Sequence, residues 1–132
     1  MIPMPWAVLV AGSREWTAAA PLIAFLRRFE VAGGIGPTLL HGGCRGADLM
    51  AADIVKRSSV PWIVHEFPAP WEAQGKRAGP ARNGLMVSTL SQFKRFGYRT
   101  AVGAFTNKSF GGTWDCVGEA LGQGFEPEVF GG

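Results

Sequence analysis

The segment that decides the fold is VLVAGSR at residues 8–14, an apolar run that ends in a glycine, a serine and an arginine. An apolar run without strict alternation is typical of a strand in a parallel sheet, because helices cover both faces of such a sheet. The first expected strand extends from Trp6 to Ala11. Four later runs rich in β-forming residues predict further strands: Thr38 to His41, Pro61 to Phe67, Thr100 to Phe105 and Pro127 to Phe130.

Apolar residues at helical spacing lie between these runs. The four stripes are Leu22, Leu26 and Phe29 after a start near Pro21; Ala47, Ala51, Ile54 and Val55; Met86, Leu90 and Phe93 up to Gly97; and Val117, Ala120 and Leu121 up to Gly122 and Gly124. Alternating strands and helices predict right-handed crossovers, and hence an α/β, Rossmann-like three-layer sandwich with a five-stranded, mainly parallel sheet. Residues 68–80 contain three prolines and no helical stripe, so we expect an irregular loop there that is long enough to cover a site.

Length and composition indicate one globular domain over residues 1–132. Apolar residues make up 47% of the chain and charged residues 17%, which argues against disorder and suits a compact core. The two cysteines, Cys44 and Cys116, have no metal-binding or redox spacing, so we expect no metal, no cofactor and a reducing cytoplasm. The apolar residues 1–11 are too few for a signal peptide or a membrane span, and no membrane partner is expected.

The net charge of +3 is too small to indicate a polyanionic partner by itself. The position of the basic residues is more informative, because several lie in or beside expected loops that carry no comparable run of acids. This distribution favours a small anionic ligand, and less readily a nucleic-acid backbone. The basic residues concerned are Arg14, Arg45, Lys76, Arg77, Arg82 and Lys108.

Three glycine-containing loops follow expected strands, at residues 12–14, 42–46 and 111–113. If the strand order is 3-2-1-4-5, it reverses between the first and fourth strands, where an open parallel sheet binds its ligands. Amides at a helix N-terminus donate to phosphate oxygens, and glycine lets the backbone approach the anion. The sequence contains neither a P-loop nor a standard dinucleotide fingerprint. Side chains that can add donors are Ser13, Thr113, Arg14, Arg45 and Arg82.

Several residues beside these loops have two interpretations. His41 either points into the crevice or locks the loop as a hydrogen-bonded structural histidine, and we favour the second. Asp48 opens a helix, where a carboxylate caps free amides and can also contact a ligand. A nucleophilic Cys44 needs a neighbouring base that only His41 offers, so we expect an ordinary side chain there. Three tryptophans can stack on a base, although core packing is commoner for this residue: Trp16, Trp71 and Trp114.

Four segments, in order, resemble the SLOG superfamily and, within it, the YspA-like branch of bacteria and their phages. They are VLVAGSR at 8–14, HGGCRGAD at 41–48, GKRAGPARN at 75–83 and GTWD at 112–115, and the resemblance covers nearly the whole chain. It implies a Rossmann-like domain that binds or senses a phosphate-containing nucleotide or nucleotide derivative. The expected ligand-binding residues are Gly12, Ser13, Arg14, Gly42, Gly43, Arg45, Gly46, Asp48, Arg82, Asn83, Gly112 and Thr113.

Relatives within the superfamily leave other functions open. The LOG phosphoribohydrolases cleave the N-glycosidic bond of nucleoside monophosphates and carry a P-G-G-x-G-T-x-x-E motif. Gly112 and Thr113 match its core, but Cys116 stands where the motif has its glutamate. If the chain is such an enzyme, Asp115 or Glu119 is the expected catalytic carboxylate. DNA-processing protein A binds single-stranded DNA, which gives a third hypothesis. LOG relatives are commonly dimers, so a homodimer or higher homo-oligomer is compatible with the resemblance.

Overall fold

The computed structural model describes residues 4–31, 35–69 and 75–131. The five strands that it contains form one sheet in the order β3-β2-β1-β4-β5, and every neighbouring pair is parallel. This confirms the expected α/β, Rossmann-like sandwich, and the strand order is the one assumed when the site was placed between the first and fourth strands. In chain order the elements are β1 (Trp6–Gly12), α1 (Ala19–Arg27), β2 (Thr38–His41), α2 (Ala47–Lys56), β3 (Ile63–Glu66), η1 (Gly75–Arg77), α4 (Ala78–Arg95), β4 (Arg99–Phe105), α5 (Gly112–Gly122) and β5 (Glu128–Phe130).

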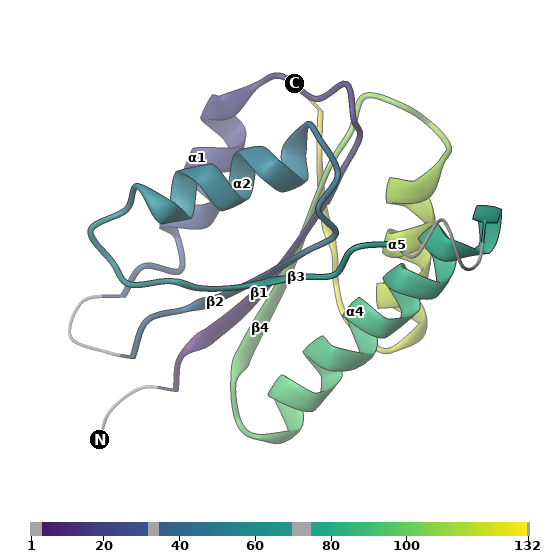
Figure 1. Cartoon of the computed structure of the whole chain (residues 1–132). Coiled ribbons are helices and arrows are strands. Elements are labelled where there is room, and N and C mark those ends of the chain that lie inside the picture. The colour runs from purple at the N-terminus through teal and green to yellow at the C-terminus, as the bar shows by residue number, and fades with distance from the viewer. Residues whose placement is uncertain (1–3, 32–34, 70–74, 132) are drawn as a thin grey trace.

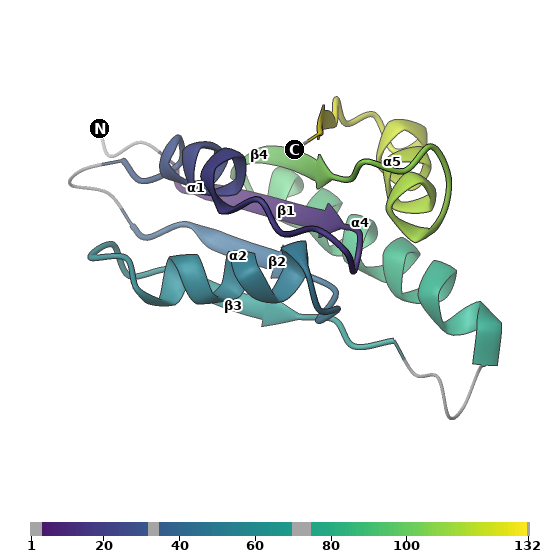
Figure 2. The same ribbon diagram turned by 90° about the horizontal axis from the view of Figure 1, so that it is seen from above.

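Helices cover both faces of the sheet. Helices α1 and α2 lie on one face and α4 and α5 on the other (Figure 1), and the view from above shows the same arrangement (Figure 2). Alternate residues of the central strand β1 point to opposite faces. Val8 and Val10 therefore pack with Phe25 of α1, whereas Leu9 packs with Leu90 of α4. Within the described ranges, no helix is both long and apolar enough to cross a membrane.

The third strand departs from its expectation. Strand β3 is limited to Ile63–Glu66, and all four of its side chains are exposed. The apolar side chains of Ile63 and Val64 are 53% and 43% exposed. The reason is position, because β3 forms an edge of the sheet and pairs only with β2. The apolar run correctly predicted a strand, but the expected cover on both of its faces was wrong.

The loop expected at residues 68–80 is also shorter than predicted. A 3-10 turn occupies Gly75–Arg77, and α4 begins directly after it at Ala78. Pro80 lies in the first turn of α4. A helix tolerates proline there because the amide nitrogens of the first turn have no acceptor within the helix. The expectation of irregular structure was therefore wrong from residue 75 onward, and residues 70–74 lie outside the described ranges. As a result, the first two turns of α4 are available to line a site.

Candidate ligand-binding site

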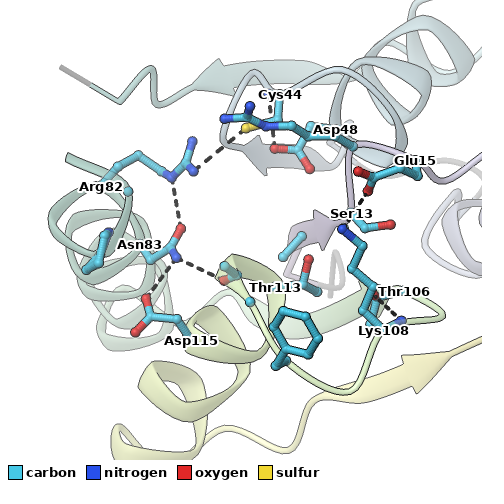
Figure 3. Close-up of a pocket in the computed structure, with 18 of the residues that line it drawn as sticks. Ser13, Glu15, Cys44, Asp48, Arg82, Asn83, Thr106, Lys108, Thr113 and Asp115 are labelled. Carbon is cyan, nitrogen blue, oxygen red and sulfur yellow. Dashed lines mark hydrogen bonds and ion pairs between the residues drawn. The ribbon is translucent and has the colours of Figure 1, made fainter. Parts of the chain in front are cut away.

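A cavity of about 490 Å³ lies at the carboxyl ends of β1 and β4 (Figure 3). The strand order reverses between these two neighbours, since β1 leads on to β2 and β4 leads on to β5 on the opposite side. This is where open parallel sheets bind ligands. The structure brings together at this cavity the sequence-predicted residues Gly12, Ser13, Arg14, Asp48, Arg82, Asn83, Gly112, Thr113 and Asp115.

Other predicted residues are not among those that line the cavity. In the loop between β2 and α2, only Cys44 contributes to the wall, so Gly42, Gly43, Arg45 and Gly46 lie outside it. Glu119 borders a separate depression along α5, which it shares with Gly118, Gly122, Gln123 and Asp115. Asp115 therefore borders both depressions, and it alone of the two proposed catalytic carboxylates faces the main cavity.

The N-terminus of α5 opens directly onto the cavity. Gly111, the residue before the helix, has a φ of +111°, a conformation that favours glycine, and no side chain caps the helix. A Cβ atom added at Gly111 or Gly112 would meet nothing within 4 Å. The amides of the first helical turn have no partner within the helix, and the helix dipole places partial positive charge at this end. The first turn of α5 can therefore receive an anion.

Three glycines at the site have a different role, because they let chain segments pack against one another. A Cβ atom at Gly12 would collide with the Cβ of Ala47, and one at Gly46 would collide with the carbonyl oxygens of Ser13 and Arg14. A Cβ atom at Gly42 would collide with the guanidinium of Arg82. Gly12 and Gly46 thus let β1 and the loop after it pack closely against the start of α2, whereas a side chain at Gly42 would displace the guanidinium of Arg82.

Arg82 holds neighbouring loops together. Its Nη1 donates to the carbonyl oxygens of Gly42 at 2.5 Å and Phe67 at 3.3 Å, and its Nε donates to Asn83 Oδ1 at 2.8 Å. Its Nη2 lies 3.8 Å from the sulfur of Cys44. The guanidinium that the sequence placed among the ligand donors is therefore largely occupied by protein acceptors, from the ends of β2 and β3.

Asn83 connects α4 to the start of α5. Its side chain is buried, and its Nδ2 donates to Asp115 Oδ2 at 2.9 Å and to the Gly112 carbonyl at 3.2 Å (Figure 3). The carbonyl oxygen of the same amide accepts the bond from Arg82. Both polar ends of Asn83 are thus used to fix the first turn of α5 and the Asp115 carboxylate at the cavity wall.

Asp48 is a buried carboxyl group at the wall of the cavity. Its Oδ2 accepts hydrogen bonds from the amides of Gly42 at 2.9 Å and Cys44 at 3.4 Å, so it satisfies the preceding loop rather than the first turn of its own helix. Among the described residues, Oδ1 has no hydrogen-bond partner. The backbone amide of Gly12 contributes the smallest of the effects that lower the pKa of Asp48. Burial dominates and raises the pKa of Asp48 to about 6.

The two cysteines lie in contrasting environments. Cys44 is half-buried and lines the cavity, whereas Cys116 is buried in the core behind it. Burial, aided by the nearby charge of Asp48, raises the pKa of the Cys116 thiol to about 12. A thiol with so high a pKa is protonated and unreactive at neutral pH. Of the two, only Cys44 is placed to meet a reagent that enters the cavity.

His41 has the structural role that we favoured from the sequence. Its side chain is buried, and its Nδ1 accepts a hydrogen bond from the Gly43 amide at 3.0 Å, which shapes the loop after β2. Burial lowers the pKa of His41. Trp16 is a core residue that packs against Phe105, and Trp114 donates its indole N–H to the Lys108 carbonyl at 2.6 Å. Trp71 lies outside the described residues.

An ion pair joins the two loops that flank the cavity. Lys108 Nζ lies 3.1 Å from Glu15 Oε2, and both residues line the cavity (Figure 3). The interaction lowers the pKa of Glu15, chiefly through the hydrogen bond from Lys108. Both side chains are about half exposed, so water and salt screen the pair. An incoming anion can therefore displace Glu15 and pair with Lys108.

Sequence reasoning missed Glu15, Thr106 and Phe110 as parts of the wall. The place of Thr106 directly after a strand could have identified it as part of the wall. Gly12 of β1 pairs with Phe105 of β4, so Ser13 and Thr106 each follow a strand at the same level of the sheet. The Ser13 amide donates to the Phe105 carbonyl at 3.0 Å, which leaves the Ser13 hydroxyl as the group it can offer a ligand. Glu15 and Phe110 lie in loops whose paths the sequence pattern did not predict.

Comparison of the chain with models of known protein families and with curated protein sequences finds no match.

Proposed function

We propose that this chain is a ligand-binding domain, as its resemblance to the SLOG superfamily implies. It holds a phosphate-containing nucleotide or nucleotide derivative in the cavity at the carboxyl ends of β1 and β4. The observation that carries the proposal is the uncapped N-terminus of α5, which opens onto the cavity with free space at Gly111 and Gly112. Such a terminus binds phosphate through backbone amides and the helix dipole.

The surrounding side chains support an anion at this position. Lys108 supplies a cation, and Ser13 and Thr106 flank the strand ends with hydroxyl groups. The cavity volume of about 490 Å³ lies within the range of small-ligand sites. The lining also contains apolar surface from Pro80 and Phe110, both exposed, as expected of a pocket that holds more than an inorganic ion. A phosphorylated organic molecule fits this combination.

Calorimetric titration with adenosine, guanosine, cytidine and uridine 5′-monophosphates tests the proposal. Gly112→Asp places a carboxylate at the first residue of α5, where it favours the helix and occupies the anion position. Gly118→Asp adds the same charge on the same helix, outside the cavity wall, at a glycine that also has free space around it. We expect Gly112→Asp to abolish binding and Gly118→Asp to retain it. Absence of binding by the unmodified protein across all four nucleotides contradicts the proposal.

Hydrolysis of a nucleotide N-glycosidic bond is a second candidate, favoured by two of the carboxyl groups in the cavity wall, those of Asp48 and Asp115. Asp115 is exposed and oriented by Asn83, whereas Asp48 is buried with a pKa raised to about 6. Carboxyl groups in such different environments can divide acid and base or charge-stabilising roles. Chromatographic detection of free base released from a nucleoside monophosphate tests this candidate. We expect Asp115→Ala to abolish release and Glu119→Ala to retain it, because Glu119 does not line the cavity.

A further inference from the structure

Phe110 is a large apolar side chain at the cavity wall. It is 74% exposed and lines the cavity directly before Gly111, the residue that precedes α5. Single exposed apolar residues are common and indicate nothing by themselves. Phe96, for example, is 79% exposed at the far end of α4 and does not line this cavity. What distinguishes Phe110 is its place beside the amides that can receive an anion.

The segment that carries Phe110 has a defined path. The Lys108 amide donates to Thr106 Oγ1 at 3.0 Å, and the Lys108 carbonyl accepts the indole N–H of Trp114. These bonds hold Lys108 against Thr106, the residue after β4, and against Trp114 in the first turn of α5. Two residues of extended chain span about 7 Å, so Phe110 lies within that distance of the Gly112 backbone. One small ligand can therefore reach the α5 amides and the Phe110 ring together.

We infer that a planar ring of the ligand stacks on the Phe110 side chain. The site then binds molecules that contain both an aromatic base and a phosphate more tightly than it binds sugar phosphates or inorganic phosphate. This inference rests on the proposed function, since it assumes that the phosphate is held at α5. Phe110 offers an exposed π-face, and aromatic faces bind nucleobases with little regard to their identity. Selectivity then comes from the presence of a base more than from which base it is.

The test compares adenosine 5′-monophosphate with ribose 5-phosphate, which carries the same sugar and phosphate without the base. Calorimetric titrations are made on the unmodified protein, Phe110→Ala, Phe110→Trp and Phe96→Ala. We expect the unmodified protein to bind the nucleotide about tenfold more tightly than the sugar phosphate. Phe110→Ala is expected to remove this preference by weakening nucleotide binding while leaving sugar phosphate binding unchanged. Phe110→Trp and Phe96→Ala are expected to keep it.

Equal affinity of the unmodified protein for both ligands, or a Phe110→Ala variant that still prefers the nucleotide, overturns the inference and leaves the proposed function standing. Loss of both affinities in Phe110→Ala, with the fold confirmed by circular dichroism, also overturns the inference, since Phe110 would then support the phosphate site rather than the base. If the unmodified protein binds neither of these ligands nor any of the other three nucleotides, the proposed function fails, and the inference fails with it.

Discussion

The side-chain amide of Asn83 donates a hydrogen bond to the carboxylate of Asp115 at 2.9 Å, across the junction between α4 and α5. A second bond from the same nitrogen reaches the Gly112 carbonyl, and the amide oxygen accepts from Arg82. The first turn of α5 is thus fixed by a residue of another helix rather than by a cap of its own. Among the described residues, no side chain caps this turn, and Gly112 and Thr113 at its start line the cavity.

Replacing Asn83 with alanine tests how much this connection stabilises the fold. The variant loses buried hydrogen bonds and leaves Arg82 Nε without its acceptor, so we expect the free energy of unfolding to fall by about 1–3 kcal/mol. Urea unfolding measures the change. Gln92→Ala, at an exposed position of the same helix, is the control and is expected to change stability by less than about 0.5 kcal/mol. Equal stability of the Asn83 variant and the unmodified protein contradicts this interpretation.

Asp48 is expected to make stability depend on pH. Burial raises its pKa from 3.8 to about 6, so the folded chain holds this proton more tightly than the unfolded chain. Between about pH 4 and 6 only the folded state keeps the proton, and the Asp48 contribution to the free energy of unfolding therefore falls as pH rises. Asp48→Asn removes this titration. We compare the free energy of unfolding of Asp48→Asn with that of the unmodified protein. We expect the difference, variant minus unmodified, to be about 2 kcal/mol larger at pH 7 than at pH 4.

Urea unfolding of both proteins at the two pH values measures this difference. Glu15 and Glu128, whose pKa values are lowered by Lys108 and Arg28 respectively, stabilise the fold with the opposite pH dependence. Both glutamates are present in each protein, so their effects cancel in the subtraction. A difference that stays constant with pH contradicts a raised pKa at Asp48.

The strands and the main walls of the cavity could be predicted from the sequence, because they follow from local patterns. Apolar runs predicted the strands, Gly12 ends β1, and Gly112 and Thr113 begin α5. Arg82 shows where such reasoning ends. Its presence near the site was predicted, but its bonds to the carbonyls of Gly42 and Phe67 depend on how three loops meet in space. A sequence motif contains no information on which acceptor a guanidinium reaches.

The same limit explains the two misplaced expectations about glycine and about β3. Gly42 and Gly46 were expected to let the backbone approach an anion, yet they make room for Arg82 and for the Ser13 carbonyl. Either role requires a missing Cβ, so residue type alone does not separate them. Likewise, the run at β3 has the composition of a buried strand, and only the finished sheet shows that it forms an edge.

The thiols are expected to differ in reactivity. Cys44 lines the cavity, whereas Cys116 is buried and has a pKa raised to about 12. Brief treatment of the folded protein with iodoacetamide is therefore expected to label Cys44 and spare Cys116 until urea is added. Peptide mass spectrometry locates the label, and Cys44→Ser is expected to show none in the folded state. Early labelling of Cys116 contradicts its burial behind the cavity.

Glu15 is expected to weaken the binding of anions, because it neutralises Lys108 in the free protein. Glu15→Gln keeps a similar shape but removes the competing charge. We expect its affinity for adenosine 5′-monophosphate to rise about twofold to fivefold at low salt, and the gain to shrink as salt is added. Glu126→Gln removes a charge from an exposed residue outside the cavity wall and is expected to leave affinity unchanged. Calorimetry that finds weaker binding by Glu15→Gln assigns Glu15 to the ligand instead.

The most direct measurement is an amide ¹H–¹⁵N NMR titration of the unmodified protein with adenosine 5′-monophosphate. Ser13, Lys108, Gly112 and Thr113 come from the ends of β1 and β4 and from the start of α5. We expect their signals to shift along one saturation curve, with the largest changes at Gly112 and Thr113, while those of the β3 edge stay in place. Spectra without saturable shifts, or with shifts centred on the β3 edge or another surface, would show that these segments do not form one anion site.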